Sequence, residues 1–128
     1  MDRRLFAKSL FTWPLLLTAS TALSTIPKQK KLLIQSSPVA GFEYHQGKEI
    51  WKKLQINHKL RLVREKSNDY DERAVAVFWQ QEKLGYVPRI ENTAIAQMLD
   101  RNVSVTAKIT CLQEDPNPWK RVLFSVYC

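Results

Sequence analysis

The sequence contains few of the residues on which catalytic and metal-binding sites usually depend. It has three glycines, two cysteines and two histidines among 128 residues. No glycine-rich loop has the spacing that holds phosphate groups, and no serine stands in a nucleophile-elbow motif. Neither His45 nor His58 has a second ligand at the spacing of a zinc site. We therefore predict a protein that is not an enzyme and that holds no metal and no cofactor.

The two cysteines, Cys111 and Cys128, are not expected to form a disulfide. If residues 103–112 and 119–128 form a simple hairpin, Cys128 lies opposite about Val103, eight residues from Cys111. A strand rises about 3.3 Å per residue, so the two cysteines would be more than about 20 Å apart, far beyond bonding distance. We predict two free thiols, with Cys111 facing the core.

The N-terminal part of the chain has an apolar stretch that is too short to span a membrane comfortably. Residues 10–23 form an apolar stretch of about 14 residues, whereas a spanning helix needs about 20. The stretch follows a basic start and ends in small residues around Ala22 and Ser24, which is the pattern of a signal peptide. We predict a signal peptide over residues 1–24, cleaved before Thr25, with cleavage after Ala22 as an alternative.

Part of this basic start resembles the twin-arginine export signal, in the residues Arg3, Arg4, Phe6 and Lys8. A Sec-type signal that happens to carry two arginines is one alternative, and an uncleaved membrane anchor is another. We predict an exported, periplasmic protein with no stable membrane span, in preference to a cytoplasmic or membrane-anchored one.

The charge of the sequence is basic even without the signal peptide. The whole chain has a formal net charge of +8, and from Thr25 onward it has 17 basic and 11 acidic residues, a net charge of +6. Such a charge raises encounter rates with nucleic acid, anionic lipid and acidic proteins without choosing among them. Single-stranded nucleic acid and an anionic envelope ligand both remain open as partners.

The rest of the chain divides into a basic linker at residues 25–31 and one domain at 32–128. Apolar residues at helical spacing predict a short helix at 46–54 and a main helix at 90–101, with Ile90 on its apolar face. Asn102 is expected to end the main helix by adopting a left-handed conformation. Strands are predicted at residues 32–44 with a bend at Pro38, 59–65, 74–79, 83–88, 103–112 and 119–128. Six or seven strands with two short helices predict a mainly β (α+β) fold, a small OB-like barrel, because closure removes exposed strand edges.

Three stretches carry a resemblance to a known family. They are Val-Ala-Gly-Phe-Glu-Tyr at residues 39–44, a segment at 62–77 that contains Asn-Asp-Tyr-Asp-Glu-Arg, and Lys-Leu-Gly-Tyr-Val-Pro at 83–88. In this order and at these spacings, over about residues 39–109, the chain resembles the HIRAN domain family. Members are small OB-like barrels found alone in bacteria and at the N-terminus of some DNA-remodelling helicases.

The resemblance implies a groove that takes the end of a single DNA strand. The groove residues of the family fall on Tyr44, near the first glycine of the matched stretches, and on Tyr70 and Asp71 in the central turn. A base stacks on a tyrosine ring with about 1 to 3 kcal/mol, and an aspartate accepts a hydrogen bond from a terminal sugar hydroxyl.

The sequence departs from the family pattern at Glu43, where DNA-binding members carry an arginine. A carboxylate at this position repels phosphate. Long cationic side chains elsewhere could compensate if they reach the same groove, and the candidates are Lys48, Arg61, Arg64 and Arg89.

Two classes of function follow from these observations. The first is a HIRAN-type nucleic-acid-binding module, with single-stranded DNA ends as the ligand. The second is an exported, non-catalytic interaction domain that binds a peptide, a glycan or an anionic envelope component, because OB-like barrels accept oligosaccharides as well as oligonucleotides. The oligomeric state is left open.

Overall fold

Six antiparallel strands form one curled sheet in the computed structural model, which describes residues 31–128. The predicted signal peptide, its cleavage site and residues 25–30 of the predicted linker lie outside the described residues. The strands are β1 (Leu33–Pro38), β2 (Lys59–Arg64), β3 (Val75–Trp79), β4 (Glu82–Tyr86), β5 (Thr106–Leu112) and β6 (Val122–Tyr127). Their order across the sheet is β1-β6-β5-β2-β3-β4.

The sheet curls far enough for its two edge strands to meet. Ala40, just after β1, and Tyr86, at the end of β4, exchange backbone hydrogen bonds of 2.8 and 2.9 Å. Gly85 permits this approach, because it has a φ of 155° and a Cβ there would collide with the carbonyl oxygen of Ala40. The bridge closes the curled sheet into the predicted OB-like barrel and so covers part of both edges.

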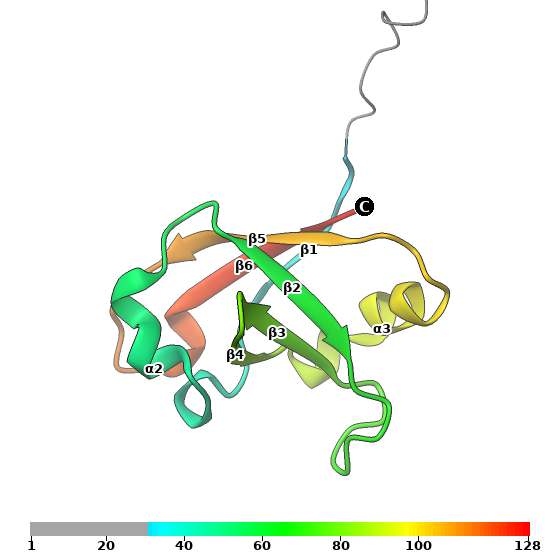
Figure 1. Ribbon diagram of the computed structural model, residues 1–128, viewed down its shortest axis with the longest axis horizontal. Helices are drawn as coiled ribbons and strands as arrows, with labels where there is room; N and C mark the ends of the chain where they lie inside the picture. Colours follow the sequence, from blue (N-terminus) through cyan, green and yellow to red (C-terminus); the bar gives the residue numbers. More distant parts are fainter. Residues whose placement is uncertain (1–30) are drawn as a thin grey trace, which may run out of the picture. The chain divides into compact units, whose positions relative to one another are not determined.

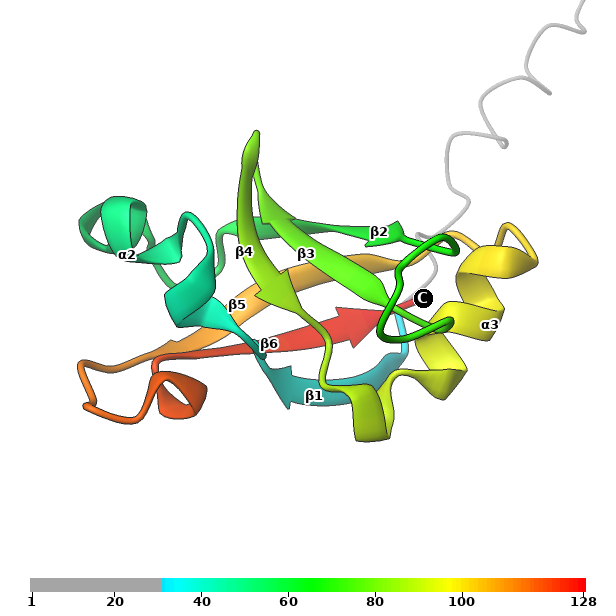
Figure 2. The ribbon, with the colours of Figure 1, turned by 90° about the horizontal axis from the view of Figure 1, so that it is seen from below.

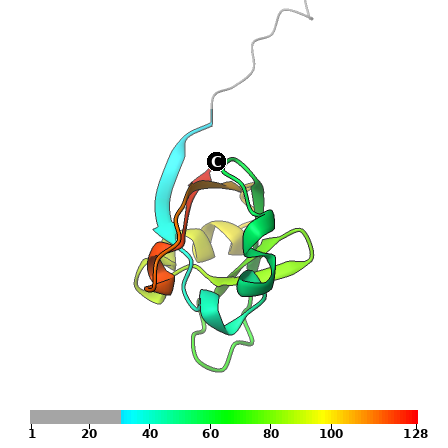
Figure 3. The ribbon, with the colours of Figure 1, turned by 90° about the vertical axis from the view of Figure 1, so that its left-hand side faces the viewer.

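The helical segments lie at opposite ends of the barrel (Figures 1 and 2). Helix α2 (Gly47–Ile50) continues into the 3₁₀ turn η4 (Trp51–Lys53) at one end, and α3 (Thr93–Asp100) lies at the other. Seen from the α2 end, the strands surround a common interior (Figure 3). Shorter 3₁₀ turns are η3 (Phe42–Tyr44), η5 (Arg89–Glu91) and η6 (Pro118–Lys120).

One apolar core fills this interior. Its largest fully buried side chains come from several strands and from both helical ends, and they include Phe42, Leu84, Ile95, Ile109 and Phe124. The alternation that predicted β2, β5 and β6 places one face of each strand in this core. Among the described residues the core residues lie within 39–126, so this domain has an apolar core of its own.

The predicted fold is confirmed, with six strands rather than seven, and several element boundaries are corrected. The first strand ends at Pro38, and Tyr44 lies in η3 rather than in a strand. The main helix begins at Thr93 rather than at 90, and Ile90 lies in η5 with 93% of its surface exposed. Pro88 and the 3₁₀ turn that follows it rotate Ile90 away from the buried helix face. Asn102 has the predicted left-handed conformation, with a φ of 59°.

Both cysteines are free thiols, as predicted. Cys111 lies opposite Leu123 in the β5–β6 pairing, and Leu123 is five residues before Cys128. The two cysteines are therefore not opposite each other. The register shifts between Ile109 and Cys111, so Leu112 packs against the core while Cys111 is only half-buried. The prediction that Cys111 faces the core is wrong because this bulge breaks the alternation. Within residues 31–128 no helix is long and apolar enough to cross a membrane.

Candidate functional site

A cavity of about 750 Å³ opens where three segments of the chain meet. These segments are residues 40–45 after β1, the turn at 65–71 after β2, and residues 86–89 at the end of β4. We call this cavity the turn pocket. It brings together four of the residues singled out in the sequence, which are Tyr44, Tyr70, Asp71 and Arg89.

Two tyrosine rings stand free at the pocket. Tyr44 has 80% of its surface exposed and Tyr70 has 87%, so neither ring fills the core. A fully exposed aromatic ring forgoes the burial that usually stabilises it, and its face is available to another flat ring. The pair therefore provides two stacking surfaces.

Hydrogen bonds to side chains hold the turn that carries Tyr70. Asn68 Oδ1 accepts from the backbone N–H groups of Tyr70 and Asp71, at 2.8 and 3.1 Å. Asp71 Oδ1 accepts from the N–H of Arg73 at 3.0 Å, and its Oδ2 accepts from Asn92 Nδ2 at 2.7 Å. Since a carboxylate has about four acceptor positions, Asp71 shapes the turn and keeps acceptor capacity for a ligand.

A polar network lies under the turn. Lys83 Nζ donates to Glu65 Oε2 at 3.0 Å and to the Tyr86 hydroxyl at 2.6 Å. The Tyr86 hydroxyl donates to Glu65 Oε1 at 2.8 Å, and Asn68 Nδ2 donates to the same oxygen at 3.2 Å. His45 packs edge-on against Tyr86, with ring centroids 5.6 Å apart. This network connects Glu65, Asn68 and Tyr86, three residues of the pocket lining, to Lys83.

The network shifts the pKa values of three groups. Burial would raise the pKa of Glu65, but hydrogen bonds from Lys83, Tyr86 and Asn68 outweigh it and leave that pKa below its ordinary value. Burial would lower the pKa of Lys83, but the Tyr86 hydroxyl and Glu65 raise it. Burial, together with the Lys83 charge, lowers the pKa of His45. At neutral pH the pocket lining therefore contains a neutral His45 and an ionised Glu65, whose partner Lys83 lies outside the lining.

The predicted compensating cations are not gathered at this pocket, apart from Arg89. Lys48 lies on α2 and does not line it. Arg61 donates to the carbonyl of Gln80 at 3.2 Å and covers the ring of Phe78. Arg64 is only 14% exposed and pairs with Asp100, with Nε and Oδ1 3.0 Å apart. Of the four candidates only Arg89 lines the turn pocket.

The comparison with known families decides the identity of the fold. The HIRAN domain family model matches residues 33–128. The chain belongs to the HIRAN domain family. The family is known for nucleic-acid binding. No curated protein matches the chain.

Two solved structures share this HIRAN fold. A protein from Lactobacillus plantarum is 24% identical, with a TM-score of 0.62 over 77% of this chain and 98% of its own. The HIRAN domain of human HLTF is 20% identical, with a TM-score of 0.57 over 76% of this chain and 78% of its own. At these identities the two structures support the barrel architecture and nothing finer.

The turn pocket of this HIRAN domain has more acidic than basic side chains in its lining, unlike a groove that binds several phosphate groups. Its lining contains the carboxylates of Glu65, Asp69 and Asp71 against the single guanidinium of Arg89. Glu43 does not line the pocket, and its Oε1 is buried with no hydrogen-bond partner within residues 31–128. The pocket therefore favours a group that donates hydrogen bonds over a group with a negative charge.

Sequence reasoning placed Asn68 in the central turn without a ligand role, and it assigned no role to Glu65, Lys83 and Tyr86. All four lie in the stretches that carry the family resemblance, and Asn68 stands in a turn-forming sequence where a side-chain cap is expected. The contacts among Glu65, Lys83 and Tyr86 join β4 to the end of β2, two strands that are not neighbours in the sheet, so sequence spacing alone does not reveal them.

Proposed function

We propose that this HIRAN domain binds single-stranded nucleic acid and takes the free 3′ end of the strand in the turn pocket. The observation that carries the proposal is the pair of exposed tyrosines beside a pocket rich in hydrogen-bond acceptors. Terminal bases stack on Tyr44 and Tyr70, each with about 1 to 3 kcal/mol. Asp71 accepts a hydrogen bond from the terminal sugar hydroxyl through its free acceptor positions.

Arg89 contributes the charge contact in this proposal. It lies at the start of η5 on the pocket lining, where its guanidinium can bind one phosphate with charge-assisted hydrogen bonds. A single phosphate contact implies a weak dependence of affinity on salt, with a slope near −0.7 for single strands. Stacking, rather than charge, therefore supplies most of the affinity.

The proposal is tested by replacing one stacking ring and comparing it with an aromatic ring outside the pocket. Tyr70→Ala is expected to weaken binding of a short fluorescent single strand about 5- to 150-fold, measured by fluorescence anisotropy. Trp119→Ala is the control, since Trp119 is 46% exposed in η6 and does not line the pocket. Equal affinity of the two variants would contradict the proposal.

A neutral glycan is the second candidate, because aromatic faces beside carboxylates also suit sugar rings and hydroxyl groups. OB-like barrels bind oligosaccharides as well as nucleic acid. A glycan would bind without any dependence on salt, whereas a strand held by Arg89 would lose affinity as salt rises. Both candidates describe a non-catalytic binding domain.

We also propose that residues 1–24 direct export of the protein to the periplasm and are then removed. The basic start and the short apolar stretch of the sequence support this proposal. Mass spectrometry of the protein recovered from the periplasm should give a chain that begins at Thr25. Lys substitutions at Arg3 and Arg4 should stop export by a twin-arginine route and leave a Sec route intact.

A further inference from the structure

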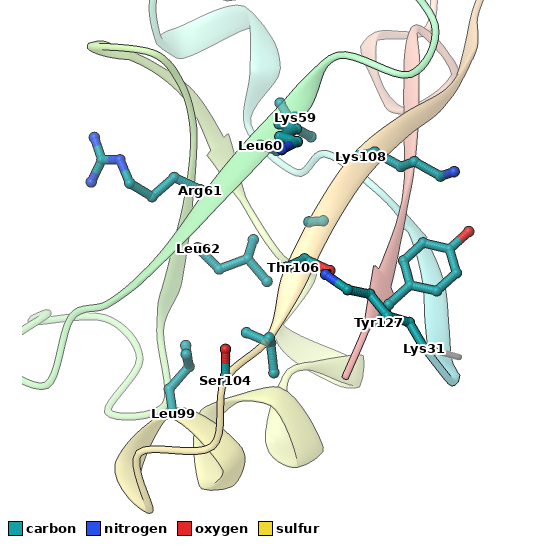
Figure 4. Close-up of a pocket in the computed structure, with 12 residues that line it drawn as sticks. Lys31, Lys59, Leu60, Arg61, Leu62, Leu99, Ser104, Thr106, Lys108 and Tyr127 are labelled. Carbon is teal, nitrogen blue, oxygen red and sulfur yellow. The ribbon is translucent and has the colours of Figure 1, made fainter. Parts of the chain in front are cut away.

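A second cavity, of about 590 Å³, opens in the wall of the barrel where β2 and β5 separate (Figure 4). The two strands pair only at Lys59 with Lys108 and at Leu60 with Ala107. From Arg61 onward, β2 pairs with β3 alone. We call this opening the strand-gap groove.

The floor of the strand-gap groove is aliphatic. Leu62 points into the gap from β2, and Leu99 on α3 lies at the end of the gap near that helix (Figure 4). Both are partly buried against the core, as is Val105 before β5, and the floor is completed by Leu60 and Ala107. None of these five side chains has a hydrogen-bonding group, so the floor suits a hydrocarbon and not a polar base edge.

The rim of the groove is basic. Lys59 and Lys108 stand directly opposite each other across β2 and β5, and like charges in this position destabilise a sheet. Lys31 also lines the groove, with its Nζ 3.4 Å from Thr106 Oγ1. No acidic residue lines the groove, and none of the ion pairs within residues 31–128 involves these three lysines.

Arg61, the remaining cation of the lining, does not contribute its charge to the groove. Its side chain points away from the gap (Figure 4), toward Phe78 and the carbonyl of Gln80. The charge available to a ligand is therefore that of the three lysines.

We propose that the strand-gap groove binds a free single-chain anionic amphiphile, with its aliphatic tail on the floor and its carboxylate between Lys59 and Lys108. The charges of the two lysines would attract the carboxylate, and the tail would cover apolar surface that is partly exposed. This site is separate from the turn pocket and does not depend on the function proposed there.

Two other occupants fit the groove less well. A nucleic-acid strand binds through aromatic stacking platforms, but the floor of this groove is aliphatic. The one aromatic residue of the lining is Tyr127, and the Nζ of Lys108 lies over its ring, 5.4 Å from the centroid. A bilayer surface suits a broad apolar face with many basic residues, whereas this is one concave opening with three lysines on its rim.

The test is a calorimetric titration of residues 25–128 with decanoate below its micelle-forming concentration. The variant with both Lys59→Gln and Lys108→Gln should bind about tenfold more weakly, because each exposed ion pair contributes up to about fivefold. The control carries Lys52→Gln and Lys53→Gln, two lysines in η4 that line neither cavity, and should bind like the unmodified protein. Affinity should rise from octanoate to decanoate by up to about fourfold per added methylene.

Equal decanoate binding by the two double variants would overturn the proposal, and so would equal binding of an uncharged decyl glycoside and decanoate by the unmodified protein. Binding to anionic phospholipid vesicles without binding of decanoate would assign the groove to a membrane surface instead. A loss of oligonucleotide affinity in the Lys59 and Lys108 variant, with no change toward decanoate, would make the groove a phosphate contact. The melting temperature of the variant should not fall, because its substitutions remove a like-charge pair.

Discussion

The carboxylate of Asp71 and the side-chain amide of Asn92 are joined by a hydrogen bond, with Asp71 Oδ2 accepting from Asn92 Nδ2 at 2.7 Å. Asn92 is fully buried immediately before α3. The bond therefore connects the turn that carries Tyr70 to the start of the main helix. Asp71 contributes to the stability of the fold as well as to the proposed ligand site.

Removal of this carboxylate should destabilise the protein. Asp71→Ala leaves the buried Asn92 amide without its acceptor, which costs about 1 to 3 kcal/mol. Urea denaturation at neutral pH measures the loss. Asp69→Ala is the control and should change the free energy of unfolding by less than about 0.5 kcal/mol, since Asp69 is exposed. Equal stability of the two variants would show that the Asp71–Asn92 bond does not hold the turn.

Closure of the barrel should depend on Gly85. Gly85→Ala places a methyl group against the carbonyl of Ala40 and should separate the bridge between the two edge strands. Gly41→Ala is the comparison, because Gly41 has a φ of 73° but a Cβ there would meet only the ring of His45, at an ordinary contact distance of 3.8 Å. We expect about 1 to 2 kcal/mol for Gly41→Ala and a larger loss for Gly85→Ala. The reverse order would contradict the role of the bridge.

Stability should fall in acid in two stages. A group whose pKa is lower in the folded protein stabilises the fold above its unfolded pKa, and this contribution disappears as the pH falls through the folded pKa. For His45 the decline begins below its ordinary pKa of 6.5, and for Glu65 below 4.5. His45→Gln should remove the first stage and Glu65→Gln the second.

The measurement for these stages is the melting temperature between pH 3 and pH 8. Glu114→Gln, at an exposed loop position, should leave the profile unchanged. A profile that is flat between pH 6.5 and pH 4.5 in the unmodified protein would contradict the direction of the His45 shift, and a profile that is flat from pH 4.5 to pH 3 would contradict that of Glu65.

The two thiols should react separately. Cys128 is exposed and should be alkylated at once, whereas half-buried Cys111 should be alkylated more slowly. Under mild oxidising conditions the mass of the monomer should stay unchanged. A monomer lighter by two hydrogen atoms would show an internal disulfide and would contradict the β5–β6 register.

Much of the barrel could be predicted from local pattern. The alternation in residues 59–65 and 103–112 gave β2 and β5 because half of each strand faces one core, and Asn102 tolerates the left-handed conformation that ends α3. Ile90 and Cys111 were misplaced for a shared reason. A 3₁₀ turn after Pro88 and a bulge after Ile109 each change which way the following side chains point, and neither leaves a periodic signal.

The candidate site was predictable to the extent that it lies in continuous stretches of sequence. Tyr44, Tyr70 and Asp71 came from the family resemblance, and the structure brings them into one pocket with Arg89. Arg61 and Arg64 are close in sequence to the turn that lines this pocket, but Arg61 binds the carbonyl of Gln80 and Arg64 binds Asp100. The two arginines are three positions apart on β2, so their side chains leave opposite faces of the strand. The strand-gap groove was not predicted, because it depends on where β2 leaves β5.

The most direct test of the central claim is a titration of residues 25–128 with a fluorescent single strand that has a free 3′ hydroxyl, beside the same strand ending in a 3′ phosphate. The account predicts tighter binding of the free end at both low and moderate salt, because Asp71 accepts from a hydroxyl and the carboxylates of the pocket repel a terminal phosphate. Equal affinity for the two strands, or no binding of either at low salt, would contradict it.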